Sequence, residues 1–154
     1  PLPDALPIYR FCPEAKVSVL SNATMVHKDA VFEALRKVDN PILKIDAPTT
    51  ALARVINRPA GGYRVERIVE ALKRFEGDFV LQTMFLKCEG FDSSSPEFLQ
   101  GWMDIVRTLR PREVMVYTID RETPQKGLIR FSPDEMRRLV QPLIDEGVQI
   151  QIRG

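Results

Sequence analysis

Cysteine and histidine are scarce in this sequence, which contains two cysteines, Cys12 and Cys88, and one histidine, His27. A single histidine cannot complete a metal cluster with two distant cysteines, so we expect no metal site within the chain. Two thiols this far apart in the sequence also provide no disulfide framework, which fits a reducing compartment. His27 has few functional residues near it in the sequence, and we expect it at the surface.

Long apolar runs are missing as well. No stretch approaches the roughly 18 consecutive apolar residues that a membrane-spanning helix requires, and the first residues lack the pattern of a signal peptide. The 22 lysines and arginines nearly balance the 21 aspartates and glutamates, for a formal net charge of +1. This balance gives no clear sign of binding to nucleic acid or to an anionic membrane. We therefore expect a cytoplasmic protein without a membrane partner.

Several motifs of common enzyme classes are absent. The sequence has no Gly-x-Gly-x-x-Gly, no Walker loop and no Gly-x-Ser-x-Gly. A Rossmann or P-loop nucleotide site and an α/β-hydrolase nucleophile therefore have no support.

The first residues differ from the rest of the chain. Residues 1–8 contain three prolines and show no periodicity, and residues 4–8 resemble the translation of a common sequencing adaptor. We interpret residues 1–10 as a truncated or non-native lead-in. Residues 11–154 are expected to form one domain, because a chain of 154 residues that is 44% hydrophobic can bury one sizeable core.

Short apolar runs alternate with helical patterns along this domain. The runs are largely β-branched, are bounded by polar residues, glycine or proline, and predict five strands at 16–20, 42–45, 79–85, 113–118 and 148–152. Apolar residues at helical spacing, together with capping residues, predict four main helices at 28–38, 65–75, 96–109 and from Ser132 to just before Gly147. The strongest start signal is the capping-box spacing of Ser132 and Glu135.

Repeated strand–helix–strand order predicts a parallel sheet, because each crossover helix returns the chain in the same direction. The fold class is therefore α/β. Periodicity alone does not distinguish an open sheet from an arc of a barrel.

The loops that follow the strands are the longest and the most polar. They cover residues 21–27, 46–62, 86–95 and 119–131, whereas the turns that precede the strands are short. In parallel sheets and barrels, ligands bind where the carboxyl ends of the strands meet. We expect a site for a polar organic ligand there, although Ser21, Asn22 and Thr24 could instead be helix-entry residues and Asp46 a turn former.

Five segments carry a resemblance to a known family: 19–24, 44–46, 56–59, 81–85 and 116–121. In their order and spacing they resemble radical S-adenosylmethionine (radical SAM) proteins, in the branch of iron-sulfur oxidoreductases that is distantly similar to the wyosine-forming enzymes. The resemblance implies the carboxy-terminal part of a partial TIM-type barrel, in which residues 17–20 correspond to about the fourth strand.

The resemblance also implies roles for individual residues. The residues that it places at the cofactor S-adenosylmethionine are Ser21, Asn22, Lys44, Asp46, Arg58, Gln82 and Thr83. Those that it places on the substrate side of the mouth are Tyr117, Thr118, Asp120 and Arg121. By their chemistry, Asp46 suits a ribose diol, and Lys44 or Arg58 suits a carboxylate. Lys44 and Asp46 should point to the same side, because side chains alternate along a strand.

The departure from that family is large. Its chemistry begins at a 4Fe-4S cluster held by a Cys-x-x-x-Cys-x-x-Cys loop, and neither Cys12 nor Cys88 lies in such a motif. We therefore expect the cluster only in a full-length parent, and we expect this chain to be inactive by itself.

Alternatives to that function stay open. One is a different barrel enzyme of aldolase or isomerase type that uses Lys44 as a base or as a Schiff-base amine. Another is a non-catalytic small-ligand-binding domain with an open, doubly wound sheet. In the fragment interpretation the strand at 16–20 lacks a neighbour, which predicts self-association through that edge.

Overall fold

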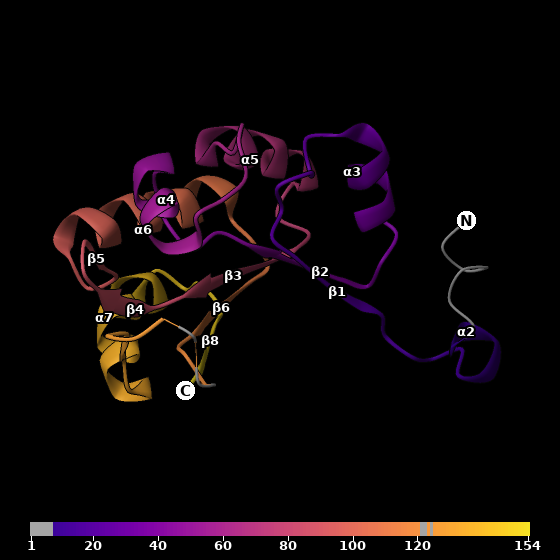
Figure 1. Ribbon diagram of the computed structural model, residues 1–154. Coiled ribbons are helices and arrows are strands. Elements are labelled where there is room, and N and C mark those ends of the chain that lie inside the picture. The colour runs from indigo at the N-terminus through magenta and orange to yellow at the C-terminus, as the bar shows by residue number, and fades with distance from the viewer. Residues whose placement is uncertain (1–7, 121–122, 124) are drawn as a thin grey trace.

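The protein is described by a computed structural model that covers residues 8–120, 123 and 125–154 (Figure 1). A short helix, α2 (Ile8–Phe11), precedes a five-stranded sheet in the order β1-β2-β3-β6-β8, in which every pairing is parallel. The strands are β1 (Ser18–Ser21), β2 (Asn40–Lys44), β3 (Val80–Met84), β6 (Glu113–Tyr117) and β8 (Ile150–Arg153). The predicted α/β class and the five predicted strands are confirmed.

The two faces of this sheet have different surroundings. Leu43 pairs with Leu81, and Leu81 with Val114, and all three are fully buried beneath the helices. One residue further along, Lys44 pairs with Gln82 and is only partly buried. Because successive side chains point to opposite faces of a strand, one face is packed in the core and the other is more open. This arrangement differs from a doubly wound sheet, in which helices cover both faces.

The helices that were predicted are present. They are α3 (Asp29–Leu35), α5 (Val65–Leu72) with the 3-10 turn η1 (Lys73–Phe75), α6 (Pro96–Leu109) and α7 (Pro133–Asp145). The Ser132 Oγ accepts a hydrogen bond from the Glu135 N–H, and the Glu135 carboxylate accepts one from the Ser132 N–H, which forms the predicted capping box. Figure 1 shows α3, α5 and α6 together on one side of the sheet, and α7 packs against β8.

Aromatic side chains form the centre of the core between β3 and α6. The ring of Phe85 makes edge-to-face contacts with Phe98 at 5.7 Å and with Trp102 at 5.1 Å between centroids. All three residues are at most 1% exposed. Burial of such rings supplies much of the hydrophobic free energy of a small domain. It also fixes the carboxyl end of β3 against α6.

The structure adds elements that the sequence patterns did not predict. Helix α4 (Thr50–Asn57) lies inside the loop expected at 46–62, and the Thr49 Oγ1 caps it by accepting a hydrogen bond from the Leu52 N–H. A small antiparallel sheet, with the order β5-β4-β7, follows β3 and β6. Its strands are β4 (Leu86–Cys88), β5 (Phe91–Asp92) and β7 (Ile129–Arg130). These strands are two or three residues long, too short for alternation to reveal.

Across the part of the chain that the structure describes, no helix is long and apolar enough to span a membrane.

Candidate functional site

A polar pocket of about 590 Å³ lies where β1 and β2 end. Its walls come from the segment after β1, the end of β2, the loop between α4 and α5, and the first turns of α5. The lining residues are Asn22, Thr24, Met25, His27, Lys44, Asp46, Asn57, Pro59, Ala60, Gly61, Gly62, Tyr63 and Arg67. The position at the carboxyl ends of parallel strands is the one that the fold class predicts for a ligand.

Asp46 is the best-connected polar residue of this pocket. Its side chain is 1% exposed, yet its carboxylate accepts hydrogen bonds from the backbone N–H of Met84 at 3.0 Å and from the Asn57 amide at 2.9 Å. The Lys44 ammonium lies 3.0 Å from the same oxygen, Oδ2, that Asn57 uses. A buried carboxylate is tolerated only with such partners. Asp46 thus joins the ends of β2, β3 and α4.

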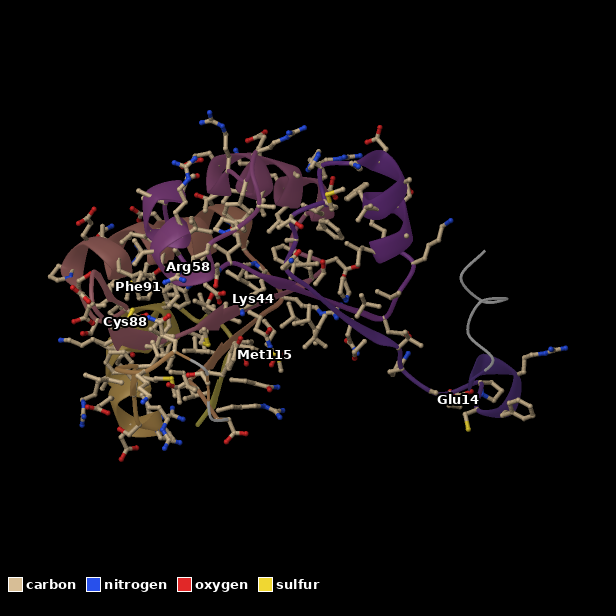
Figure 2. All side chains as sticks on the ribbon, viewed as in Figure 1. Glu14, Lys44, Arg58, Cys88, Phe91 and Met115 are labelled. Carbon is tan, nitrogen blue, oxygen red and sulfur yellow. The ribbon has the colours of Figure 1, made fainter. Side chains whose placement is uncertain are left out.

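Lys44 reaches from β2 across the open face of the sheet, in the row that Gln82 of β3 and Met115 of β6 continue (Figure 2). Its ammonium lies 5.8 Å from the centroid of the Tyr117 ring on β6. Partial burial by itself would lower the pKa of Lys44, but the charge of Asp46 and the phenol oxygen of Tyr117 outweigh burial, and the pKa is raised above its ordinary value of 10.5. Lys44 is therefore a protonated cation at the pocket wall.

Tyr63 contributes an aromatic side chain to the lining of the pocket. Burial, followed by the nearby carboxylates of Asp46 and Glu66, raises the pKa of the Tyr63 phenol, so the group is neutral at physiological pH. The Thr50 hydroxyl donates to Glu66 at 2.8 Å and accepts from the Val65 N–H at 2.9 Å. This bridge between α4 and α5 sets the course of the loop that carries Tyr63.

Asn22 lies on the rim of the pocket and organises the segment after β1. Its Oδ1 accepts hydrogen bonds from the Thr24 N–H at 3.2 Å and from the Thr24 hydroxyl at 2.8 Å. The side-chain nitrogen of Asn22 is then the group that can donate a hydrogen bond to a ligand. These bonds close a local turn and cap no helix, because α3 begins at Asp29 with Lys28 as its N-cap, so the helix-entry interpretation of Asn22 is wrong.

Four residues predicted at the cofactor lie outside this pocket: Thr83, Ser21, Arg58 and Gln82, the last of which lines a second pocket. Thr83 is fully buried on the helix-covered face, where its hydroxyl donates to the Ile45 carbonyl. The Ser21 Oγ accepts a hydrogen bond from the Ala23 N–H, and Ser21 does not line the pocket. Arg58, in the left-handed conformation with φ 41°, ends α4 and is exposed. The expectation that Ser21 and Thr83 surround the same hollow as Asn22 and Asp46 is therefore wrong.

The residues expected on the substrate side gather elsewhere. A second pocket of about 370 Å³ on the open face is lined by Gln82, Tyr117, Thr118 and Asp120, among others. The Thr118 side chain is buried, and its hydroxyl donates to the Phe85 carbonyl at 2.9 Å. Asp120 is exposed. Arg121 lies outside the described residues.

Some lining residues were not predicted from the sequence. Arg67 on α5, Tyr63 before it, and Asn57 at the end of α4 all enter the pocket, as does His27. Asn57 lies in the segment 56–59 that carries the family resemblance, and Asn57 and Tyr63 flank the Pro59–Gly62 stretch of the lining, so a polar side chain beside such a loop is the available signal. These side chains come close to the end of β2 only because of the way in which α4 and α5 pack.

The thiols do not contribute to this site. Cys12 is exposed and Cys88 is partly buried. Within residues 8–120, 123 and 125–154, no group of three or more histidine, cysteine, aspartate or glutamate side chains could hold a metal ion. Two cysteines do not fit a cluster that requires three thiolates.

In sequence, the chain is similar to two curated proteins. No protein-family model matches the chain. The UPF0026 protein slr1464 from Synechocystis is 28% identical over 116 residues, which is 73% of this chain and 41% of that protein. The ribosomal protein uS12 methylthiotransferase RimO from Synechococcus is 29% identical over 114 residues, which is 70% of this chain and 24% of RimO. The chain thus spans less than half the length of these curated relatives.

Solved structures share the fold. A radical SAM methyltransferase from Sphaerobacter thermophilus has a TM-score of 0.68 and 16% identity, over 88% of this chain and 39% of that one. A domain of the pyruvate-formate lyase-activating enzyme from Bacteroides vulgatus has the same TM-score with 12% identity, over 96% of this chain and 88% of that one. Streptococcus suis SuiB bound to S-adenosylmethionine has a TM-score of 0.58 and 18% identity, over 91% of this chain and 31% of that one.

These likenesses define the class of the fold: an α/β protein whose parallel sheet corresponds to part of a radical SAM partial barrel. In sequence and in fold, the resemblance to radical SAM enzymes is confirmed.

Proposed function

We propose that the chain is the carboxy-terminal part of a radical SAM enzyme and that the polar pocket at the ends of β1 and β2 binds S-adenosylmethionine. The observation that carries the proposal is the composition of this pocket. It combines two cations, Lys44 and Arg67, with the amides of Asn22 and Asn57 and one aromatic wall, Tyr63. The fold supports it, since radical SAM enzymes share this sheet and SuiB, one of the structural neighbours, is bound to S-adenosylmethionine.

The pocket suits the parts of this cofactor. Its volume of about 590 Å³ falls within the usual range for small-ligand sites, roughly 300–1,000 Å³. The Lys44 and Arg67 charges suit an α-carboxylate, and the Asn22 and Asn57 amides suit the hydroxyl groups of a ribose. The ring of Tyr63 offers a face for the adenine base.

Asp46 has a different role from the one that resemblance implies. Two protein groups, Asn57 and Met84, donate to its carboxylate, and the Lys44 ammonium lies beside it. Only 1% of the Asp46 side chain is exposed, so little of its carboxylate is accessible to a ribose diol. We assign direct ligand contact to Lys44 and Asn57 instead.

The residues of this chain do not account for the iron-sulfur cluster of a radical SAM enzyme. The chain has two cysteines and does not fit a three-thiolate cluster. We propose that a cysteine-rich loop outside these 154 residues supplies the cluster in the longer protein. Bound S-adenosylmethionine supplies radical chemistry in this family, and the residues of this chain bind and orient the cofactor, with Tyr117 and Asp120 facing the substrate side.

An aldolase- or isomerase-type use of Lys44 is disfavoured. A Schiff-base lysine needs a depressed pKa so that its amine is neutral. The pKa of Lys44 is raised, because Asp46 and Tyr117 outweigh the effect of burial.

The proposal is tested by calorimetry with S-adenosylmethionine on the 154-residue chain. Lys44→Met and Arg67→Gln should each weaken binding by at least about tenfold, because each removes a charge-assisted contact. The matched control is Arg137→Gln, which removes an exposed arginine from α7, away from the pocket, and should leave the affinity unchanged. No measurable binding by the unmodified chain, or equal loss in the control, would contradict the proposal.

A further inference from the structure

Asp46 occupies an unusual position for a pocket residue, since it lines the pocket and yet is almost completely shielded from solvent. Its Oδ1 accepts a hydrogen bond from the backbone N–H of Met84 on β3. Its Oδ2 accepts a hydrogen bond from the Asn57 amide at the end of α4 and forms an ion pair with the Lys44 ammonium of β2. One carboxylate therefore holds the ends of three different elements. Such a group orders its neighbours more than it contacts a ligand.

We propose that Asp46 is the positioning residue of this pocket: its buried carboxylate holds the Lys44 ammonium at the pocket wall, so that Lys44 meets the anionic end of the bound ligand. The inference deepens the proposed function and rests on it for the identity of the ligand. The geometric basis is independent of the ligand, because it consists of contacts between protein atoms.

The path of the lysine side chain supports this role. Lys44 starts from the open face of β2 and its side chain is 28% exposed, so it is neither free in solvent nor sealed in the core. A flexible four-carbon side chain in that position has many rotamers, and restricting them costs conformational entropy. The Lys44 ammonium lies 3.0 Å from the Asp46 carboxylate and 5.8 Å from the centroid of the Tyr117 ring, and these two interactions favour one rotamer of the lysine over the others.

The charges around Lys44 come from a small set of groups. Asp46 lies beside it, two residues past the end of β2, Tyr117 faces it from β6, and Tyr63 faces the same space from the loop before α5. Arg67 lines the same pocket from α5. Asp46 is the carboxylate that pairs directly with the ammonium. Removing its charge leaves Lys44 partly buried without its counter-ion, which favours the neutral amine.

The first test follows Lys44 itself and needs no ligand. In chain labelled at the lysine ε-carbon, NMR titration should give a pKa for Lys44 above that of the exposed lysines, and Asp46→Asn should lower it. Glu33→Gln, which removes an exposed carboxylate on α3, is the control and should leave the Lys44 pKa unchanged. A Lys44 pKa at or below that of the exposed lysines in the unmodified chain overturns the inference, even if Asp46→Asn fails to fold.

The second test is a double-mutant cycle in binding. Asp46→Asn should weaken S-adenosylmethionine binding by about tenfold in the unmodified chain and by less than about twofold in a Lys44→Met background, because it acts through Lys44. Equal losses in both backgrounds overturn the positioning role. If the chain does not bind S-adenosylmethionine at all, the proposed function fails, and the NMR titration alone decides the role of Asp46.

Discussion

The indole N–H of Trp102 on α6 donates a hydrogen bond to the hydroxyl of Thr83 on β3 at 2.9 Å. The same hydroxyl donates to the backbone carbonyl of Ile45 at 2.8 Å, and both Thr83 and Trp102 are fully buried. Thr83 therefore connects the end of β3, the residue after β2 and the longest helix. It stabilises the frame on which the pocket is built, and it does so from the face opposite the open one.

Thr83→Val is expected to destabilise the protein by about 1–3 kcal/mol, because it leaves the Trp102 indole N–H and the Ile45 carbonyl buried without their partner. Urea unfolding followed by tryptophan fluorescence measures the change. Thr108→Val, at an exposed position of α6, serves as the control and should change stability by less than about 1 kcal/mol. An equal loss in the two variants would contradict the role given to Thr83.

Gly77→Ala is expected to cost more than about 1 kcal/mol, because the residue has a left-handed backbone. Its φ is +87°, and an added Cβ would lie 2.5 Å from the carbonyl oxygen of Arg110. Thermal unfolding compares it with Gly61→Ala, where nothing lies within 4 Å of the added atom. A melting temperature that falls no further in Gly77→Ala than in Gly61→Ala would refute this prediction.

The start of α7 should make stability depend on acid pH. The backbone N–H and then the hydroxyl of Ser132 donate to Glu135 and lower the pKa of its carboxyl below 4.5. The contribution is complete above the pKa of the unfolded chain and is lost as the pH falls through the folded value. Glu135→Gln should therefore be less stable than the parent at pH 7, and the difference should shrink towards pH 3. A difference independent of pH, measured by urea unfolding, would argue against this.

The edge of β1 is expected to drive self-association. Among the described residues β1 pairs only with β2, and Leu20 on this strand is 65% exposed. Leu20→Lys should reduce concentration-dependent association in sedimentation velocity, because a charge on an edge strand disfavours pairing. The matched control is Val55→Lys, at an exposed position of α4. Monomeric behaviour of the unmodified chain at all concentrations would disprove the prediction.

Local patterns were sufficient for the frame of the sheet. Five apolar runs and four helices lie in the order expected, and the start of α7 follows from the spacing of Ser132 and Glu135. Helix α4 was not predicted, because residues 50–57 lie between two proline-containing segments and read as part of one long loop. Short helices depend on tertiary packing more than on propensity.

The alternation of side chains along a strand explains why some residues predicted at the cofactor lie on the covered face. Gln82 and Thr83 were both predicted at the cofactor, although adjacent residues of a strand face opposite sides. Gln82 pairs with Lys44 and shares its open face, so Thr83 must enter the core. Ser21 pairs with Leu43, which is fully buried, and belongs to the covered face for the same reason.

The sequence by itself determined the parallel α/β class, the end of the sheet at which the pocket lies, and the common direction of Lys44 and Asp46, because each depends on spacing within one or two neighbouring segments. Only the tertiary structure decided that Asp46 is buried among partners and that Arg67 and Tyr63 complete the pocket. Those facts depend on how α4 and α5 pack beside β2, and contacts between elements distant in sequence leave little trace in local periodicity.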